Sequence, residues 1–299
     1  MHKISSGKGP AQAKARVPGM YCLLACMPKS GSTFLSKAVS ELPGMRRVHL
    51  VPGYQRREQE LDPGILAQQA QNQRYLTQLW KQGQLKQESR PRGWVAQHHV
   101  RYHQTTHDLI REWGITPIVL VRNIYDVVPS IYDHLSGQAK FMQEGKSPVG
   151  NNQYMSMAYV AEDALTYDRE TFLEFIAEMV IPWYFNFYTS WTAAPNATLI
   201  TYEEMIDNPR ATLSKVVELM RNPFSGAEVA AALEAAQSGM TRQNKGHAGR
   251  GADLPDSVRR KIESYARFYP GIDFSPIGLG SAEEARAKGL KGIGKKETA

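Results

Sequence analysis

The fold of this chain is decided by Tyr21-Cys-Leu-Leu-Ala-Cys-Met27, which runs directly into Pro28-Lys-Ser-Gly-Ser-Thr-Phe34. The first half is apolar and predicts a buried strand, and the second half predicts a loop that opens a helix over 35–41. Gly31 lets the backbone turn tightly and approach a ligand closely. The first N–H groups of a helix attract an anion, and Lys29 adds a full positive charge. The stretch therefore predicts a site for a phosphate or a similar group.

A second motif follows another apolar run, Thr116-Pro-Ile-Val-Leu-Val121, which predicts a second buried strand. Arg122 stands at the carboxyl end of this strand, where open parallel sheets bind ligands. Asp126 falls in the first turn of the next helix, and Ser130 lies one turn further on. An arginine and a hydroxyl that converge from a strand end and a helix suit a second phosphate.

The loop order Pro-Lys-Ser-Gly-Ser-Thr-aromatic resembles the 5′-phosphosulfate loop of sulfotransferases that use 3′-phosphoadenosine 5′-phosphosulfate (PAPS). A Walker A loop places its lysine after the last glycine, whereas Lys29 precedes Gly31 here. The eight-residue spacing from Arg122 to Ser130 resembles the 3′-phosphate motif of the same family. The resemblance implies that Phe34 stacks on the adenine. It assigns these loop residues to cofactor binding: Lys29, Ser30, Gly31, Ser32, Thr33 and Phe34.

Two later segments resemble the same family, so the resemblance covers about residues 20–270. Tyr202-Glu-Glu-Met resembles a strand end whose tyrosine lies near the adenine. Arg242-Gln-Asn-Lys-Gly-His-Ala-Gly249 resembles a late loop that closes over the 3′-phosphate. In this loop Asn244 stands where the family has arginine, so only Lys245 and Gly246 carry over as cofactor-binding residues.

The catalytic set implied by the resemblance includes Lys29, which would neutralise charge on the bridging oxygen, and Ser130. The acceptor must also lose a proton, which requires a general base. Small-molecule sulfotransferases carry a Thr-His pair at nearly the position of His98 and His99, and this favours His99 over His98. Gln97 stands where those enzymes have lysine. Carbohydrate-directed relatives instead use a glutamate after the first loop, so Glu60, with Glu58 beside it, is the alternative.

Alternating strand and helix patterns predict an α/β fold with a mainly parallel central sheet flanked by helices on both faces. This architecture is a P-loop-like three-layer sandwich. We expect one sulfotransferase domain over residues 20–279, between flexible basic tails at 1–19 and 280–299. The formal charge is +7, of which residues 1–20 hold +4 and residues 280–299 hold +2. The remaining charge of about +1 gives no reason to expect nucleic-acid binding by the body.

The two cysteines, Cys22 and Cys26, share one face of the first predicted strand about 13 Å apart, which is too far for a disulfide. Unpaired cysteines, and the lack of an apolar run of the ~20 residues that span a bilayer, favour a cytoplasmic location. Met1–Arg16 lacks the apolar stretch of a secretory signal. The sequence leaves a homodimer open.

The sequence therefore predicts a sulfotransferase that moves a sulfuryl group from PAPS to a hydroxyl or amine of a small-molecule or carbohydrate acceptor. Adenosine 3′,5′-bisphosphate (PAP) would be the product, and no metal is expected. A P-loop-like nucleotide kinase is the first alternative, but it would need Mg²⁺ and a carboxylate beside the loop to hold it. A nucleotide-binding scaffold without catalytic activity is the second alternative.

Overall fold

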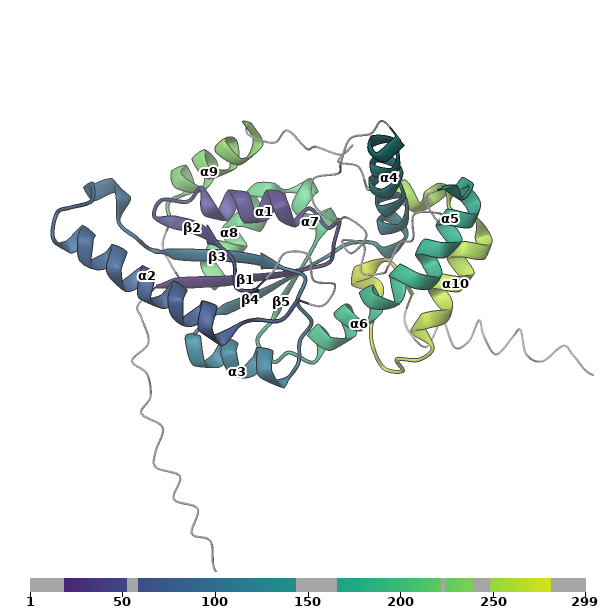
Figure 1. The fold of residues 1–299 in the computed structure, drawn as a ribbon, viewed down its shortest axis with the longest axis horizontal. Coiled ribbons are helices and arrows are strands. Elements are labelled where there is room, and N and C mark those ends of the chain that lie inside the picture. The colour runs from purple at the N-terminus through teal and green to yellow at the C-terminus, as the bar shows by residue number, and fades with distance from the viewer. Residues whose placement is uncertain (1–18, 53–58, 144–165, 222–223, 239–247, 281–299) are drawn as a thin grey trace, which may run out of the picture.

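Five short strands form one parallel sheet, as the alternating strand and helix patterns predict (Figure 1). The computed structural model describes residues 19–52, 59–143, 166–221, 224–238 and 248–280. The sheet order is β2-β3-β1-β4-β5, and every neighbouring pair is parallel. The strands are β1 (Met20–Cys26), β2 (Met45–Val48), β3 (Gly93–His98), β4 (Thr116–Val121) and β5 (Thr198–Thr201). The central position of β1 explains why all seven of its residues are buried.

Helices cover both faces of this sheet, which confirms the predicted α/β fold. Figure 1 shows α1 and α9 above the sheet and α2 and α3 below it. On one face lie α1 (Ser32–Ser40), α7 (Tyr202–Asp207), α8 (Pro209–Leu219) and α9 (Gly226–Ser238). On the other lie α2 (Pro63–Lys81), α3 (Gln104–Trp113), α4 (Ile124–Gln143), α5 (Arg169–Phe175), α6 (Ile181–Thr192) and α10 (Asp256–Ala266). Short helical turns complete the described chain: η1 (Gln87–Ser89), η4 (Ile176–Val180), η5 (Arg250–Asp253) and η6 (Ser275–Ile277).

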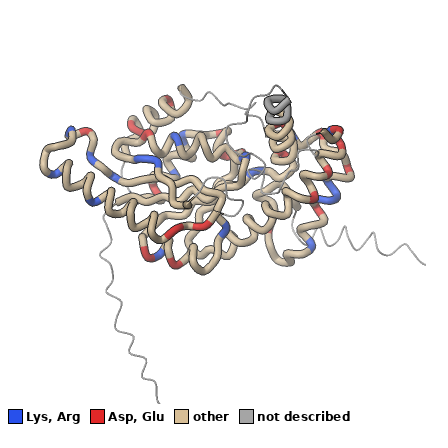
Figure 2. The backbone as a smooth tube through the Cα atoms, in the orientation of Figure 1, with Lys and Arg blue, Asp and Glu red and all other residues tan. Residues whose placement is uncertain are grey.

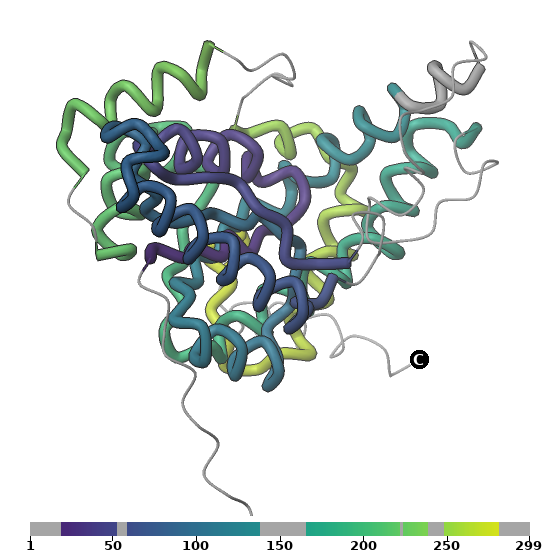
Figure 3. The backbone as a smooth tube through the Cα atoms, turned by 60° about the vertical axis from the view of Figure 1, so that its left-hand side comes forward, coloured from purple at the N-terminus to yellow at the C-terminus, as the bar shows by residue number. Residues whose placement is uncertain are grey.

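The alternation of side chains along β1 divides the core into two layers. Cys22, Leu24 and Cys26 point to the layer beneath α1, whereas Leu23 and Ala25 point to the opposite layer. Figure 3 shows the first layer from a second direction, with α9 beside α1. Both cysteines are free and buried, and burial raises the pKa of each thiol to about 12. They are protonated core residues, as the sequence predicts.

Two helical segments differ from the expectation. The helix after Val121 runs to Gln143, although we expected it to end near His134. The pattern predicted over 153–191 lies partly outside the described residues. Its described part is α5, the π-helical turn η4 and α6 in succession. The aromatic run of α6 is core, because Trp183, Tyr184, Phe185, Phe187, Tyr188 and Trp191 are all buried.

Basic and acidic residues are interspersed along the described body, consistent with its small net charge (Figure 2). The predicted basic tails lie outside the described residues, apart from Gly19 and Gly280. Of the helices that the structure describes, none combines the length and the apolar character needed to cross a membrane.

Candidate active site

The loop between β1 and α1 is shaped by two residues with a left-handed backbone. Lys29 has a φ of 66° and Gly31 a φ of 78°, so the chain reverses sharply within five residues. A Cβ at Gly31 would lie 2.5 Å from Met205 Cε and 2.9 Å from Tyr202 Cδ2. Glycine is therefore required here both by conformation and by the close approach of α7. Ser30 is fully buried, and its hydroxyl donates to Met27 O at 2.6 Å, so this side chain holds the loop internally.

Two backbone carbonyl groups of the loop between β1 and α1 accept hydrogen bonds from buried side chains. Tyr184 Oη donates to Pro28 O at 3.2 Å, and Arg122 Nη1 donates to Lys29 O at 2.9 Å. Gly31 is the N-cap of α1, and no side chain of the described residues caps that helix. The first N–H groups of α1 are therefore left for an anion, which the helix dipole favours.

The remaining loop residues differ in exposure. Ser32 is buried, and its hydroxyl accepts a hydrogen bond from Gln97 Nε2 at 2.8 Å. Thr33 is exposed, and Phe34 is half-buried against the core layer beneath α1. Gln97, which stands at the lysine position of the resembled pattern, thus contacts the loop between β1 and α1.

Arg122 follows β4 and reaches across to this loop, as the second motif predicts. Only 5% of the residue is exposed, and its guanidinium lies 4.2 Å from the centre of the Tyr202 ring. Its Nη2 atom is 3.9 Å from Asp126 Oδ2. Burial lowers the pKa of Arg122, but an arginine stays charged in proteins. Tyr202, predicted beside the adenine, stacks on this cation and packs against Gly31.

A third cation joins this region from the C-terminal part of the chain. The pKa of Lys29 is lowered first by burial and then by the positive charges of Arg122 and Arg250. Arg250 was not among the predicted residues, although its position between two glycines, close after the predicted late loop, was a usable signal. Ser130 is buried on α4, one turn beyond Asp126. Lys245 and Gly246 lie outside the described residues.

His99 lies just beyond the end of β3, on the same side of the sheet as Cys26. Its Nδ1 atom is 2.8 Å from Cys26 O, and its backbone N–H donates to Gln59 Oε1 at 2.7 Å. Because a carbonyl oxygen only accepts, Nδ1 carries the proton and Nε2 keeps a lone pair. Burial lowers the pKa of His99, which favours the neutral imidazole. His99 therefore has the protonation state of a general base.

His98 points to the opposite face, as strand alternation requires. Its Nε2 atom accepts the Leu50 N–H at 2.9 Å, and only 1% of the residue is exposed. Burial, together with the neighbouring His49 and His99, lowers the pKa of His98 to about 3. The candidate base His98 is therefore corrected to a core residue, because its only basic nitrogen is already hydrogen-bonded.

Glu60 is exposed and lines a separate hollow of about 300 Å³ that also contains His103 and Thr106. Its neighbour Gln59 is the residue that turns inward and contacts the backbone of His99. Glu58 lies outside the described residues.

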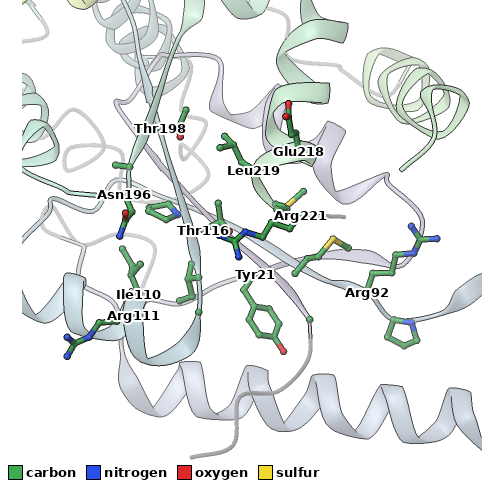
Figure 4. A pocket seen from close by; sticks show the side chains of 18 of the residues that line it. Tyr21, Arg92, Ile110, Arg111, Thr116, Asn196, Thr198, Glu218, Leu219 and Arg221 are labelled. Carbon is green, nitrogen blue, oxygen red and sulfur yellow. The ribbon is translucent and has the colours of Figure 1, made fainter. Parts of the chain in front are cut away.

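A cavity of about 1630 Å³ lies at the opposite edge of the sheet, where the strands begin. Figure 4 shows Tyr21, Thr116 and Thr198 there, together with basic side chains. Arg111 belongs to the last turn of α3, and Arg221 follows Met220, the C-cap of α8. These cations complement the negative carbonyl ends of the helices. Because parallel sheets bind ligands at the carboxyl ends of their strands, we place the active site at the loop.

Comparison with known proteins identifies the family of this chain. A family model described as "Sulfotransferase domain" matches residues 21–263, so the chain belongs to the sulfotransferase family. The matched residues run from β1 into α10 and include the loop, Arg122 and His99. The sulfotransferase prediction is thereby confirmed, and the reaction class is sulfuryl transfer. No curated protein matches the chain.

Solved sulfotransferase structures resemble this chain at low sequence identity, and one of them reaches a TM-score above 0.5. Mouse sulfotransferase SULT7A1, crystallised with PAP, is 14% identical with a TM-score of 0.52, covering 93% of this chain and 90% of that one. Retinol dehydratase in complex with retinol and PAP is 14% identical with a TM-score of 0.39, covering 96% and 85%. A sulfotransferase from Alicyclobacillus acidocaldarius is 11% identical with a TM-score of 0.39, covering 89% and 98%.

Proposed function

We propose that this protein transfers the sulfuryl group of PAPS to a hydroxyl or amine of a small-molecule or carbohydrate acceptor, with His99 as general base. One observation carries the proposal. The Arg122 guanidinium is bonded to the backbone of Lys29 at 2.9 Å, so two cations from neighbouring strand ends share one site. The mouse sulfotransferase, which has the same fold, was crystallised with PAP, and this supports PAPS as the donor.

The two phosphates of PAPS would occupy the two ends of this site. The first N–H groups of α1 and the Lys29 ammonium would hold the phosphosulfate, because both present positive charge to the same loop. Arg122 and Ser130 would hold the 3′-phosphate. The other proposed cofactor contacts are Ser30 through its backbone, Gly31, Ser32, Thr33, Phe34, Tyr202, Lys245 and Gly246.

The chemistry requires a proton acceptor and a group that stabilises the leaving oxygen. The acceptor O–H or N–H bond breaks as the new bond to sulfur forms, and His99 Nε2 takes that proton. The bond from sulfur to the PAP phosphate oxygen breaks, and Lys29 neutralises the charge that remains on that oxygen. Cys26 O, bonded to His99 Nδ1–H, orients the ring and stabilises the imidazolium. Glu60 is the alternative base, although its side chain lines a different hollow.

Ligand-dependent melting tests the donor site without knowledge of the acceptor. PAP should raise the Tm of the full chain more than ATP with Mg²⁺ does, because a ligand that binds only the native state stabilises it. Arg122→Gln should reduce the PAP shift strongly. Arg111→Gln is the matched control, since it removes the same charge from an exposed site at the other edge of the sheet.

The same experiment separates the alternatives. A larger shift with ATP and Mg²⁺ would indicate a nucleotide kinase and would contradict the proposal. A PAP shift combined with no transfer from labelled PAPS to any member of a broad acceptor panel, read by mass spectrometry, would indicate a scaffold that binds nucleotide without catalysis.

A further inference from the structure

One buried carboxylate, that of Asp126, hydrogen-bonds the turn η5 to the start of α4. Asp126 Oδ2 accepts the Gly249 N–H and Asp126 Oδ1 accepts the Gly251 N–H, each at 2.7 Å. A Cβ at Gly251 would lie 2.5 Å from Tyr125 Cβ and 2.6 Å from its carbonyl carbon, so the turn packs directly on the helix. Arg250, between the two fastened glycines, is therefore held at a fixed place above α4.

The Arg250 side chain runs along the segment of α4 that contains the proposed phosphate hydroxyl. Its Nη2 atom donates to Asp133 Oδ2 and lies 3.5 Å from Pro129 O. Pro129 precedes Ser130 in the chain, and Asp133 follows it by one helical turn. Only 17% of the Arg250 side chain is exposed. The guanidinium is thus placed over the Ser130 turn rather than extended into solvent.

Arg250 is also close enough to the other cations of the site for its positive charge to act on them. Its positive charge lowers the pKa of both Lys29 and Arg122, after the larger effect of burial in each case. Asp133 acts on Lys29 in the opposite direction. Glu203 and Asp126 act on Arg122 as well, so the three cations Lys29, Arg122 and Arg250 share this site with three carboxylates.

We propose that Arg250 is a further cofactor-binding residue of this chain, whose guanidinium binds the 3′-phosphate of PAPS beside Arg122 and Ser130. The inference rests on the proposed function and adds one residue to it. A guanidinium can give a phosphate two parallel hydrogen bonds. Asp133 orients the Arg250 side chain and competes with the phosphate for it.

The test compares binding of PAP and of adenosine 5′-phosphate, which lacks the 3′-phosphate, by isothermal titration calorimetry. Arg250→Gln should weaken PAP about 10- to 100-fold, the usual effect of losing a hydrogen bond to a charged group. Binding of adenosine 5′-phosphate should change less than about twofold. Arg250→Lys should recover part of the loss, since lysine restores the positive charge but not the two parallel donors of the guanidinium.

Asp133→Asn distinguishes a ligand contact from a structural ion pair. The variant keeps an oxygen that can accept from Arg250 but removes the competing charge, so PAP should bind several-fold more tightly. If the pair only stabilises the turn, Arg250→Gln and Asp133→Asn should weaken both nucleotides alike, and the inference is wrong. Arg259→Gln is the control for the turn itself, because Arg259 donates to the carbonyls of Gly251, Ala252 and Leu254 and its guanidinium lies 5.0 Å from the centre of the Tyr125 ring. It should leave the PAP preference unchanged.

Failure of this inference differs from failure of the proposed function. A wild-type protein that binds PAP no better than adenosine 5′-phosphate has no 3′-phosphate site, and the proposed function itself is contradicted. A wild-type protein that prefers PAP, with the same preference in Arg250→Gln, keeps the proposed function and excludes Arg250 alone.

Discussion

At the residue scale, the adjacent histidines His98 and His99 show how strand alternation separates packing from chemistry. The two side chains lie on opposite faces of the sheet, so one meets Leu50 N–H and the other meets Cys26 O. The first contact occupies the basic nitrogen, and the second leaves it available. Sequence spacing alone ranked His99 first, but only the hydrogen bonds supply the reason.

The protonation state of His99 can be measured directly. Long-range ¹H–¹⁵N spectra of the imidazole rings, assigned by comparison with His99→Gln, should show Nδ1 protonated and Nε2 unprotonated at neutral pH. The ring should titrate below 6.5, because burial disfavours the charged form. With any identified acceptor, His99→Gln should lower kcat about 100-fold or more, whereas Glu60→Gln should not.

A titration midpoint at or above 6.5 would contradict this assignment of the base. Loss of turnover in Glu60→Gln with normal turnover in His99→Gln would transfer the role to Glu60.

At the element scale, the site depends on hydrogen bonds between the start of α4, which follows β4, and the distant turn η5. The helix α4 begins directly after β4, and its first-turn carboxylate Asp126 holds η5 from more than a hundred residues away along the chain. The carboxylate, 2% exposed, satisfies two backbone N–H groups that would otherwise be buried without partners. The same contact therefore joins the strand end, the helix and the late turn into one wall of the site.

Removal of the Asp126 charge should loosen this wall. In Asp126→Asn one of the two carboxylate oxygens becomes an NH₂ group, which cannot accept the backbone N–H that it faces. We therefore expect the free energy of unfolding to fall by about 2–4 kcal/mol. Hydrogen exchange should accelerate in residues 249–253, and PAP affinity should fall. Asp108→Asn, which removes an exposed partner of Arg111, is the control and should change neither quantity.

Unchanged exchange in this turn would mean that Tyr125 packing, and not the Asp126 carboxylate, holds η5 in place.

At the scale of the whole molecule, the open parallel sheet has two different edges. Loops from β1, β3, β4 and β5 meet at the carboxyl edge, where N–H groups of α1 and the buried cations lie. The larger cavity lies at the amino edge, where helices end and their carbonyls are complemented by arginine and lysine. Cavity size therefore points to the amino edge, whereas the direction of the strands and helices points to the carboxyl edge, where we propose the active site.

Global stability should depend on pH through the buried His98. Its folded pKa of about 3 is below the unfolded value of 6.5, so the unfolded chain binds a proton that the folded chain does not. The contribution of neutral His98 to the free energy of unfolding is complete above pH 6.5 and is lost as the pH falls toward 3. Between pH 6.5 and pH 5 the free energy of unfolding should fall by about 2 kcal/mol more in wild type than in His98→Gln, measured by urea denaturation. Equal slopes in the two proteins would show that His98 is not buried in its neutral form.

Local sequence patterns determined most of the fold and the cofactor loop. Apolar runs predicted the two strands that precede the motifs, β1 and β4, and the order of lysine, glycine and hydroxyl residues predicted an anion site. Helix ends were less predictable, as the extension of α4 to Gln143 shows, because tertiary packing outweighs a weak local stop signal. Glu58, Lys245, Gly246 and both predicted tails stay predictions, since they lie outside the described residues.

The sequence by itself predicted the parallel α/β fold, the anion loop around Lys29 and the second motif at Arg122, because each of these patterns lies in neighbouring residues. Only the tertiary structure decided that His98 is core, that Ser30 bonds within the loop and that Arg250 reaches the site. Ser30 bonds to Met27, only three residues away, whereas the outcomes for His98 and Arg250 depend on atoms that meet across 48 to 125 residues of chain. Such contacts are set by sheet order and by competition for buried hydrogen bonds, which no local pattern contains.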